Sequence, residues 1–177
     1  MPFPPKAIAN RLLDLAEQHG ESLTPMKLQK LVYYSHGWML GIRNRELINE
    51  DVEAWKFGPV IRSLFREFVE FGMKPITERA NDMKLTDDFD WEITTPSIDE
   101  HDAPDEVVDA DEVLNKVWEV YGGFTATRLS KMTHMPGTPW DQIYKKHSGH
   151  LPDRALIPND MIREYFANVA ARKAAER

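Results

Sequence analysis

Apolar residues recur with the period of an α-helix along most of this chain. Helical stretches are predicted at residues 5–19, 24–40, 60–72 and 109–121, followed by a short helical pair within 125–146 and a last helix from 158 onward. Only brief segments, at 47–48, 52–55, 75–77 and 91–94, have the composition of strands. The pattern therefore predicts a mainly α protein: a single compact helical domain of about six helices over residues 1–177, with at most a small β-sheet or hairpin.

The stretch from Leu23 to Leu40, LTPMKLQKLVYYSHGWML, is expected to be the central helix. Thr24 is placed to cap it, and Ser35 to bond back to a carbonyl one turn earlier. At 100° per residue, one arc faces the core and holds Leu28, Leu31, Val32, Ser35, Trp38 and Met39, and the opposite arc holds Gln29, Lys30, Tyr33 and Gly37. Tyr33, Tyr34 and His36 are then candidates for an interaction surface, although a plain core helix explains the same pattern.

A second landmark is AWKFGPVIRSLFREFVEFG at residues 54–72. Gly58-Pro59 marks an abrupt change of direction, and the helical period is clear from Val60 onward. Arg62 and Arg66 lie one turn apart on the predicted solvent side. They either anchor a partner or form a solvated face supported by Glu70.

Acidic residues are concentrated in one part of the chain. Residues 82–112 carry thirteen Asp and Glu against one Lys, a charge of −12 that leaves +5 for the rest of a chain whose total is −7. At about 78–108 the hydrophobic pattern decays, and an acidic, loop-rich excursion is expected. This excursion is either simply solvated or a docking surface for a basic partner.

The composition and motifs argue against several classes of protein. Without cysteine there is no disulfide framework and no thiolate nucleophile, and a reducing cytoplasm is the expected location. No signal peptide and no apolar run of about 18 residues is found, so no membrane association is expected. His147 and His150 lie around a Ser-Gly pair that interrupts any helix, and no HExxH frame, GxSxG elbow or phosphate-binding glycine loop occurs. We therefore expect no enzyme activity, metal or cofactor.

Nucleic-acid binding is an alternative that the residues support only in outline. Residues 125–146 resemble a helix-turn-helix in their order of elements, with Lys145 and Lys146 on the second helix. Pro136 and Pro139 crowd the turn, and the net negative charge opposes phosphate binding. Protein binding is the preferred interpretation, through aromatic and arginine side chains of the type that anchors interfaces: Tyr33, Trp55, Phe57, Arg62, Arg66 and Trp140. Trp55 and Trp140 are equally explained as core residues.

Three blocks carry a resemblance to a known family. They are TPMKLQKLVYYSHGW at 24–38, EAWKFGPVIRSLF at 53–65 and TATRLSKMTHMPGTPW at 125–140. In this order and spacing the blocks resemble the Panacea domain of SocA-like antitoxins, which are often carried on phages and mobile elements. The resemblance extends from Ile8 to about Phe166, and the segment from Glu78 to Glu112 carries no part of it.

The resemblance implies a mostly helical, non-catalytic antitoxin that binds and neutralises a co-encoded protein toxin; toxic alarmone synthetases are among the toxins of this family. One family member acts instead as an adaptor that delivers its toxin to the ClpXP protease, so delivery is the alternative mechanism, and a DNA-binding regulator is the further one. Because the family pairs with diverse toxins, recognition is expected from exposed positions within the blocks and from the acidic segment. Lys56 and His134 join the partner-binding candidates already named within the blocks, which include Tyr34 and His36.

Overall fold

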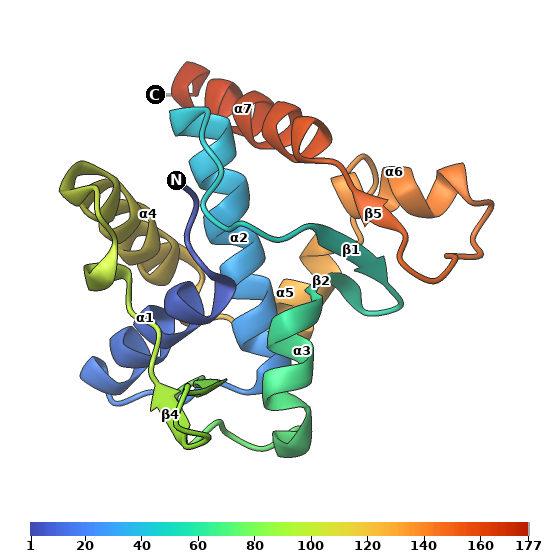
Figure 1. The fold of residues 1–177 in the computed structure, drawn as a ribbon. Coiled ribbons are helices and arrows are strands. Elements are labelled where there is room, and N and C mark those ends of the chain that lie inside the picture. Colours follow the sequence, from blue (N-terminus) through green and yellow to red (C-terminus); the bar gives the residue numbers. More distant parts are fainter. Residues whose placement is uncertain (177) are drawn as a thin grey trace.

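A long central helix, α2, is surrounded by the other helices in the computed structural model, which describes residues 1–176 (Figure 1). Within these residues the α-helices are α1 (Pro5–Gln18), α2 (Pro25–Arg43), α3 (Arg62–Phe68), α4 (Pro104–Tyr121), α5 (Ala126–Thr133), α6 (Pro139–Lys146) and α7 (Asn159–Ala175). The strands are β1 (Val52–Trp55), β2 (Gly58–Ile61), β3 (Asp82–Leu85), β4 (Trp91–Thr94) and β5 (Leu156–Ile157), and two 3₁₀ turns are η1 (Val69–Phe71) and η2 (Ile98–Glu100). The predicted mainly α fold is confirmed, with seven α-helices where about six were expected.

Helix α2 is buried on nearly all sides. Gln29, Lys30, Tyr33 and Gly37, which lie on the arc opposite the predicted core face, are buried as well. The physical reason is that α1, α4, α5, α7 and β2 all pack against α2, so no arc of it is left to solvent. The predicted local bonds are present: Thr24 accepts from the Lys27 amide at 3.4 Å, and Ser35 Oγ donates to the Leu31 carbonyl at 2.8 Å.

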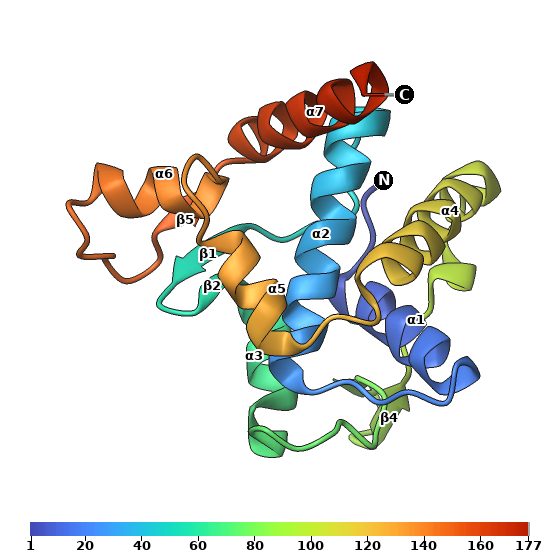
Figure 2. The same cartoon turned by 180° about the vertical axis from the view of Figure 1, so that it is seen from behind.

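Helix α7 crosses the C-terminal half of α2 at close range, as Figure 2 shows from behind. Two glycines of α2 make this approach possible. A Cβ atom built on Gly37 would lie 2.2 Å from Cε2 of Phe166, and one on Gly41 would lie 2.7 Å from Cβ of Phe166 and 2.8 Å from the Ala167 amide nitrogen. These glycines therefore let the Phe166 ring and the α7 backbone rest directly on α2.

A small antiparallel sheet of order β2-β1-β5 lies to one side of the bundle. Val52 of β1 pairs with Ile61 of β2 on one side and with Ile157 of β5 on the other. The predicted helix from Val60 onward was wrong at its start, because residues 60 and 61 complete the β2 ladder and α3 begins only at Arg62. Phe65 and Val69, expected in the core, are 40% and 48% exposed.

The acidic segment 78–108 contains regular structure where loops were expected. Strands β3 and β4 form a separate antiparallel hairpin, followed by η2 and then α4, which begins at Pro104, five residues before the predicted start. The strand expected at 91–94 is confirmed, while the one expected at 75–77 is absent and residues 82–85 provide the partner strand instead. On α4, Val113, Leu114 and Val117 are buried, whereas Val120 is exposed.

Candidate functional site

The two tyrosines of the central helix are core residues and not part of an exposed surface. Tyr33 and Tyr34 are 2% and 6% exposed. The Tyr34 ring stacks on Tyr121 of α4 with ring centroids 4.5 Å apart, and the Tyr33 ring meets the edge of Phe166 at 6.0 Å. Burial raises the pKa of both phenols. Of the two interpretations left open, the plain core helix holds for these tyrosines, because α4 and α7 cover both sides of the helix.

His36 is a buried connector between three segments. Its Nε2 lies 2.9 Å from Oδ1 of Asn159, while its Nδ1 accepts from the amides of Leu47 and Ile48 at 3.3 and 3.4 Å. Because Nδ1 is an acceptor for both amides, Nε2 carries the proton and donates to Asn159. Burial lowers the pKa of His36, which favours this neutral form. His36 thus positions the start of α7 and is not exposed for a partner.

The turn between β1 and β2 is where the three sequence blocks meet. Its two central residues, Lys56 and Phe57, are exposed, and Phe57 is 58% exposed. From the third block, Ser130 Oγ donates to the Phe57 carbonyl at 2.9 Å and Trp140 Nε1 donates to the Trp55 carbonyl at 2.7 Å. The blocks therefore hold the backbone of this turn in place, and we call this set of contacts the clamp.

Two further contacts tighten the clamp. His134 Nε2 lies 3.1 Å from the Lys56 carbonyl, and the His134 ring lies 3.9 Å from the Trp140 ring. From the first block, Lys30 Nζ donates to the Pro59 carbonyl at 2.9 Å. Gly58 has φ +107°, and a Cβ there would lie 2.6 Å from Thr133 Oγ1 and 3.0 Å from Lys30 Nζ, so this position requires glycine.

Arg62, predicted either to anchor a partner or to belong to a solvated face, pairs instead with Glu53 of β1. Its Nε donates to Oε1 of Glu53 at 2.9 Å and its Nη2 to Oε2 of Glu53 at 2.8 Å, and Trp55 Nε1 donates to the same Oε2 at 2.8 Å. The Arg62 guanidinium holds the pKa of the Glu53 carboxyl below its usual value. The support expected from Glu70 is replaced by this pair, since β1 lies beside the start of α3. Arg66 is exposed, as predicted.

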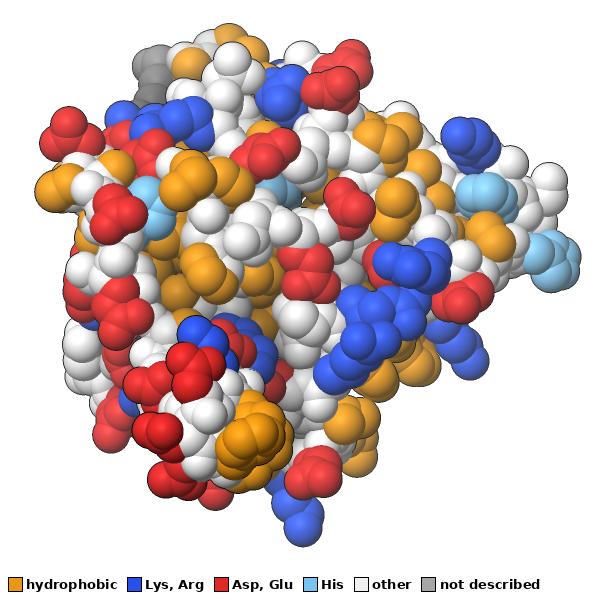
Figure 3. Space-filling view, viewed as in Figure 1, with side chains coloured by type: hydrophobic (Ala, Val, Ile, Leu, Met, Phe, Trp, Pro, Cys, Tyr) orange, Lys and Arg blue, Asp and Glu red, His pale blue; other side chains and the backbone are white. Residues whose placement is uncertain are grey.

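Two cavities open on either side of the β1–β2 turn, and Trp55 and Lys56 line both. The larger, of about 640 Å³, lies towards α6, and its walls include Arg62, Trp140, Tyr144, Leu151 and Arg154. The smaller, of about 460 Å³, is an apolar groove between the start of α2 and α3, lined by Met26, Lys30, Phe57, Val60, Leu64, Phe65 and Val69. Figure 3 shows Lys and Arg side chains gathered over this side of the molecule. We call the turn with this groove the turn surface.

Lys30 lies at the base of the groove and is a buried lysine without an acidic partner among the residues that the structure describes, although the helical pattern puts it on the arc opposite the predicted core face. It is 1% exposed, and within residues 1–176 no carboxylate lies within 4.0 Å of its Nζ. Burial lowers the pKa of Lys30 from 10.5 to about 7. A clue was present in the sequence, because the Gly58-Pro59 turn leaves a carbonyl that needs a donor, but nothing local connects that carbonyl to Lys30.

The structure therefore separates the ten candidate residues into two groups. Trp55, Lys56, Phe57, Arg62, His134 and Trp140 lie together around one turn, with Arg66 further along α3, whereas Tyr33, Tyr34 and His36 lie in the core. Among residues 1–176, no three His, Asp or Glu side chains are arranged to hold a metal ion. None of the helices in the described part of the chain is both long enough and apolar enough to span a membrane.

Comparison of the sequence with known proteins identifies the class to which this chain belongs, a family of antitoxins. Residues 28–141 match the family described as Antitoxin SocA-like, Panacea domain, and the chain belongs to that family. It is 35% identical to Antitoxin SocA of Caulobacter vibrioides (strain NA1000 / CB15N) over 161 residues, which cover 91% of this chain and 81% of the relative. No solved structure matches the chain.

Proposed function

We propose that this protein is the antitoxin of a toxin–antitoxin pair and neutralises a co-encoded protein toxin by direct, stoichiometric binding. The observation that carries the proposal is membership of the SocA-like family, with similarity to a named antitoxin along 91% of the chain. In this proposal the chain performs no chemistry of its own. It blocks the active site of the toxin or holds the toxin in an inactive conformation.

The turn surface is the part of the three blocks that we propose to contact the toxin. Phe57 supplies an exposed aromatic anchor on a turn whose backbone is held from three sides, and Phe65 and Val69 continue the apolar area beside it. A rigid aromatic anchor beside a groove loses little conformational entropy on binding. Lys56 and Arg66 provide a polar rim. Trp55, Arg62, His134 and Trp140 contribute by holding the turn in place.

This division changes which substitutions are informative. Reversing the charge of Arg62 would leave Glu53 unpaired in a buried site and so would test stability rather than binding. Phe57→Ser combined with Arg66→Glu is the better pair, because both side chains are exposed and the clamp on the turn stays intact. Arg163→Glu on α7 is a control, because it is a charge reversal on an element that does not line the turn surface.

The test is co-expression with the product of the adjoining reading frame under an inducible promoter. We expect the wild-type chain to restore growth and to co-purify with that product at a fixed ratio, with the half-life of the toxin unchanged. The double variant should lose both rescue and co-purification at an equal protein level, while the control keeps them. If cells that co-express the toxin with the wild-type chain stop growing as cells without the chain do, the antitoxin function is refuted.

The half-life measurement separates neutralisation from proteolytic delivery. A toxin that disappears only when both this chain and the ClpXP protease are present would replace direct neutralisation by the adaptor mechanism. A toxin that persists but is harmless supports a stable complex.

A further inference from the structure

The β3–β4 hairpin carries an apolar face that nothing in residues 1–176 covers. Met83 pairs with Ile93 and Leu85 pairs with Trp91 across the two strands, and directly opposed residues point to the same face of a hairpin. The exposed fractions of these four side chains lie between 48% and 64%. Together with Phe89 at the tip, which is 85% exposed, they form what we call the hairpin face.

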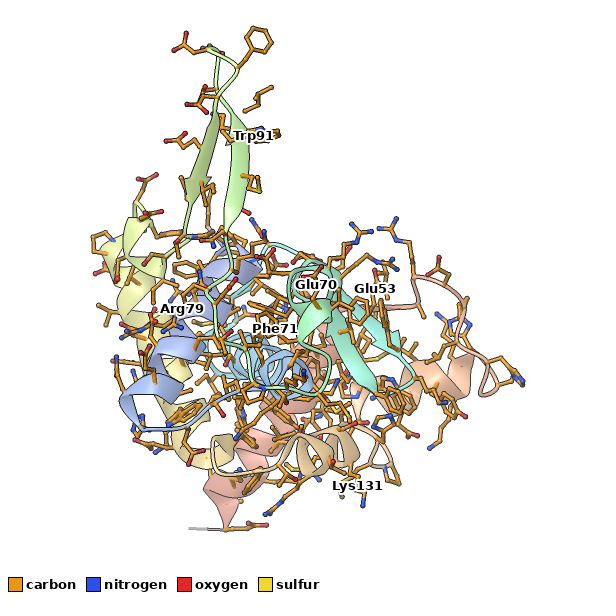
Figure 4. The ribbon with its side chains drawn as sticks, turned by 90° about the horizontal axis from the view of Figure 1, so that it is seen from below. Glu53, Glu70, Phe71, Arg79, Trp91 and Lys131 are labelled. Carbon is orange, nitrogen blue, oxygen red and sulfur yellow. The ribbon has the colours of Figure 1, made fainter. Side chains whose placement is uncertain are left out.

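The other face of the same hairpin is polar. Lys84 pairs with Glu92 and Asp82 pairs with Thr94. An antiparallel sheet with one apolar and one polar face normally packs its apolar face on a core. Here the hairpin projects away from the body, with Trp91 directed into solvent (Figure 4). An exposed apolar patch of this kind on a folded protein is typical of an interaction site.

The base of the hairpin is bonded to α1, whereas the hairpin face is exposed. Asn10 of α1 is buried, and its Nδ2 donates to the carbonyls of Ala80 and Pro96 at 3.0 and 2.9 Å, one on each side of the hairpin. Its Oδ1 accepts from the Ala80 amide at 2.7 Å. Lys6 adds a bond to the Asn81 carbonyl at 2.7 Å and an ion pair with Asp82 at 2.9 Å. The hairpin is therefore presented from a fixed position on α1.

At the tip of the hairpin, Phe89 is exposed and has a backbone conformation that is unfavourable for phenylalanine. The Thr86 amide donates to the Asp90 carbonyl at 2.8 Å, and the Phe89 amide donates to the Thr86 carbonyl at 3.0 Å. Phe89 has φ +59°, a left-handed conformation that glycine or asparagine adopts far more easily than phenylalanine. A bulky apolar residue at such a position, exposed to water, has no role in the packing of this chain.

We propose that the hairpin face inserts into an apolar groove, rimmed by Lys and Arg side chains, on the cognate toxin; this rests on the proposed antitoxin function and names a second contact beyond the turn surface. Charge complementarity identifies the kind of partner. Residues 82–94 carry five carboxylates against one lysine, a net charge of −4, and three of these carboxylates, Asp87, Asp88 and Asp90, flank Phe89 at the tip. Two copies of this chain meeting through their hairpin faces would oppose −4 to −4, whereas a basic rim would pair these carboxylates. Figure 3 shows hydrophobic side chains among acidic ones in the lower part of the molecule, where the hairpin lies.

Matched double substitutions test the proposal on the full-length chain. Trp91→Thr with Ile93→Thr, the apolar-face variant, removes the two apolar side chains that β4 contributes to the hairpin face. Lys84→Thr with Glu92→Thr, the polar-face variant, removes one cross-strand pair from the other face, and both variants keep the net charge and the β propensity of the hairpin. The probe is the product of the adjoining reading frame, and binding is measured by titration calorimetry or by co-purification together with growth rescue. Circular dichroism melting of each variant shows that the fold is retained.

We expect the apolar-face variant to bind at least 100-fold more weakly and to fail in rescue, while the polar-face variant stays within about threefold of wild type. Reversing charge at the tip, with Asp87→Lys and Asp88→Lys, should slow association and reduce its salt dependence. Equal binding by the apolar-face variant and wild type would refute the hairpin proposal while leaving the antitoxin function standing. Failure of wild-type rescue would instead refute the function itself.

Two other occupants would also overturn the proposal. A wild-type dimer in light scattering that the apolar-face variant converts to monomer would show that a second copy covers the hairpin. Binding of the wild type to the ClpXP protease, without the toxin present and lost in the same variant, would assign the hairpin face to the protease.

Discussion

Replacing Lys30 by methionine should stabilise this protein most at neutral pH and progressively less as the pH rises. Lys30 is almost completely buried, and its ammonium group has the Pro59 carbonyl, 2.9 Å away, as its hydrogen-bond acceptor. Methionine has a similar length and flexibility and carries no charge, so it fills the same space without the desolvation cost. The buried ammonium group of Lys30 thus destabilises the folded state, although it donates the hydrogen bond that holds the β1–β2 turn.

The magnitude follows from the pKa of Lys30, which burial lowers from 10.5 to about 7. At about 1.36 kcal/mol per unit, keeping this lysine charged in the fold costs about 5 kcal/mol relative to the unfolded chain. The variant also loses the hydrogen bond to the Pro59 carbonyl, and this loss lowers the free energy of unfolding by about 1–2 kcal/mol. We therefore expect Lys30→Met to raise the free energy of unfolding by about 3 kcal/mol at pH 7.

The pH dependence has a definite sign. Between pH 7 and 10.5 the unfolded chain binds a proton at Lys30 that the folded chain has released, so the stability contributed by this group rises with pH and is lost as the pH falls towards 7. The advantage of the variant over the wild type should therefore shrink by about 2 kcal/mol between pH 7 and pH 9.

Urea unfolding followed by circular dichroism at several pH values measures this difference. Lys131→Met, at an exposed position on α5, is the matched control and should show no such trend. A difference between Lys30→Met and wild type that stays constant within about 0.5 kcal/mol over this range would refute the assignment of a depressed pKa to Lys30.

Three further predictions concern the supports of the fold. Because burial lowers the pKa of His36 below 6.5, the wild type should lose stability as the pH falls below that value, and His36→Asn, which does not titrate, should lack this part of the acid-side loss in urea unfolding. Gly41→Ala should cost about 1–3 kcal/mol in thermal unfolding, since its Cβ would meet α7, whereas Gly123→Ala, with open space around it, should stay within about 0.5 kcal/mol. Asn10→Ala should cost about 3 kcal/mol by leaving the hairpin base without its three bonds, and should raise amide hydrogen exchange across residues 81–95; unchanged exchange there would contradict the rigid base.

Much of the helical content could be predicted because its signals are local. Thr24 and Thr125 each accept a bond from the amide three residues later, as their positions before Pro25 and Ala126 suggest. The strand at 91–94 was found from composition alone. Its partner at 82–85 was not, although Met83 and Leu85 alternate with polar residues, because a single lysine and the surrounding acidic residues resemble a solvated loop.

The candidate site was predicted less well, for a reason that concerns burial. The helical period of the central helix identifies which residues share an arc, but it cannot show how many neighbours surround the helix. The sequence therefore left open whether Tyr33, Tyr34 and His36 form an interaction surface or belong to the core, and the structure buries them. The sequence likewise placed Arg62 on the solvent side of its helix, but only the structure shows that it pairs with Glu53 on β1.

By itself the amino-acid sequence determined the positions of most helices, the three blocks and the antitoxin family, because capping, periodicity and motif spacing depend on residues close together in the chain. Only the tertiary structure decided that the blocks converge on the turn at Lys56 and Phe57, that Lys30 is buried beneath it, and that the hairpin face is exposed to solvent. These features depend on contacts between segments far apart in the chain, and such contacts cannot be recognised from the hydrophobic periodicity of either segment.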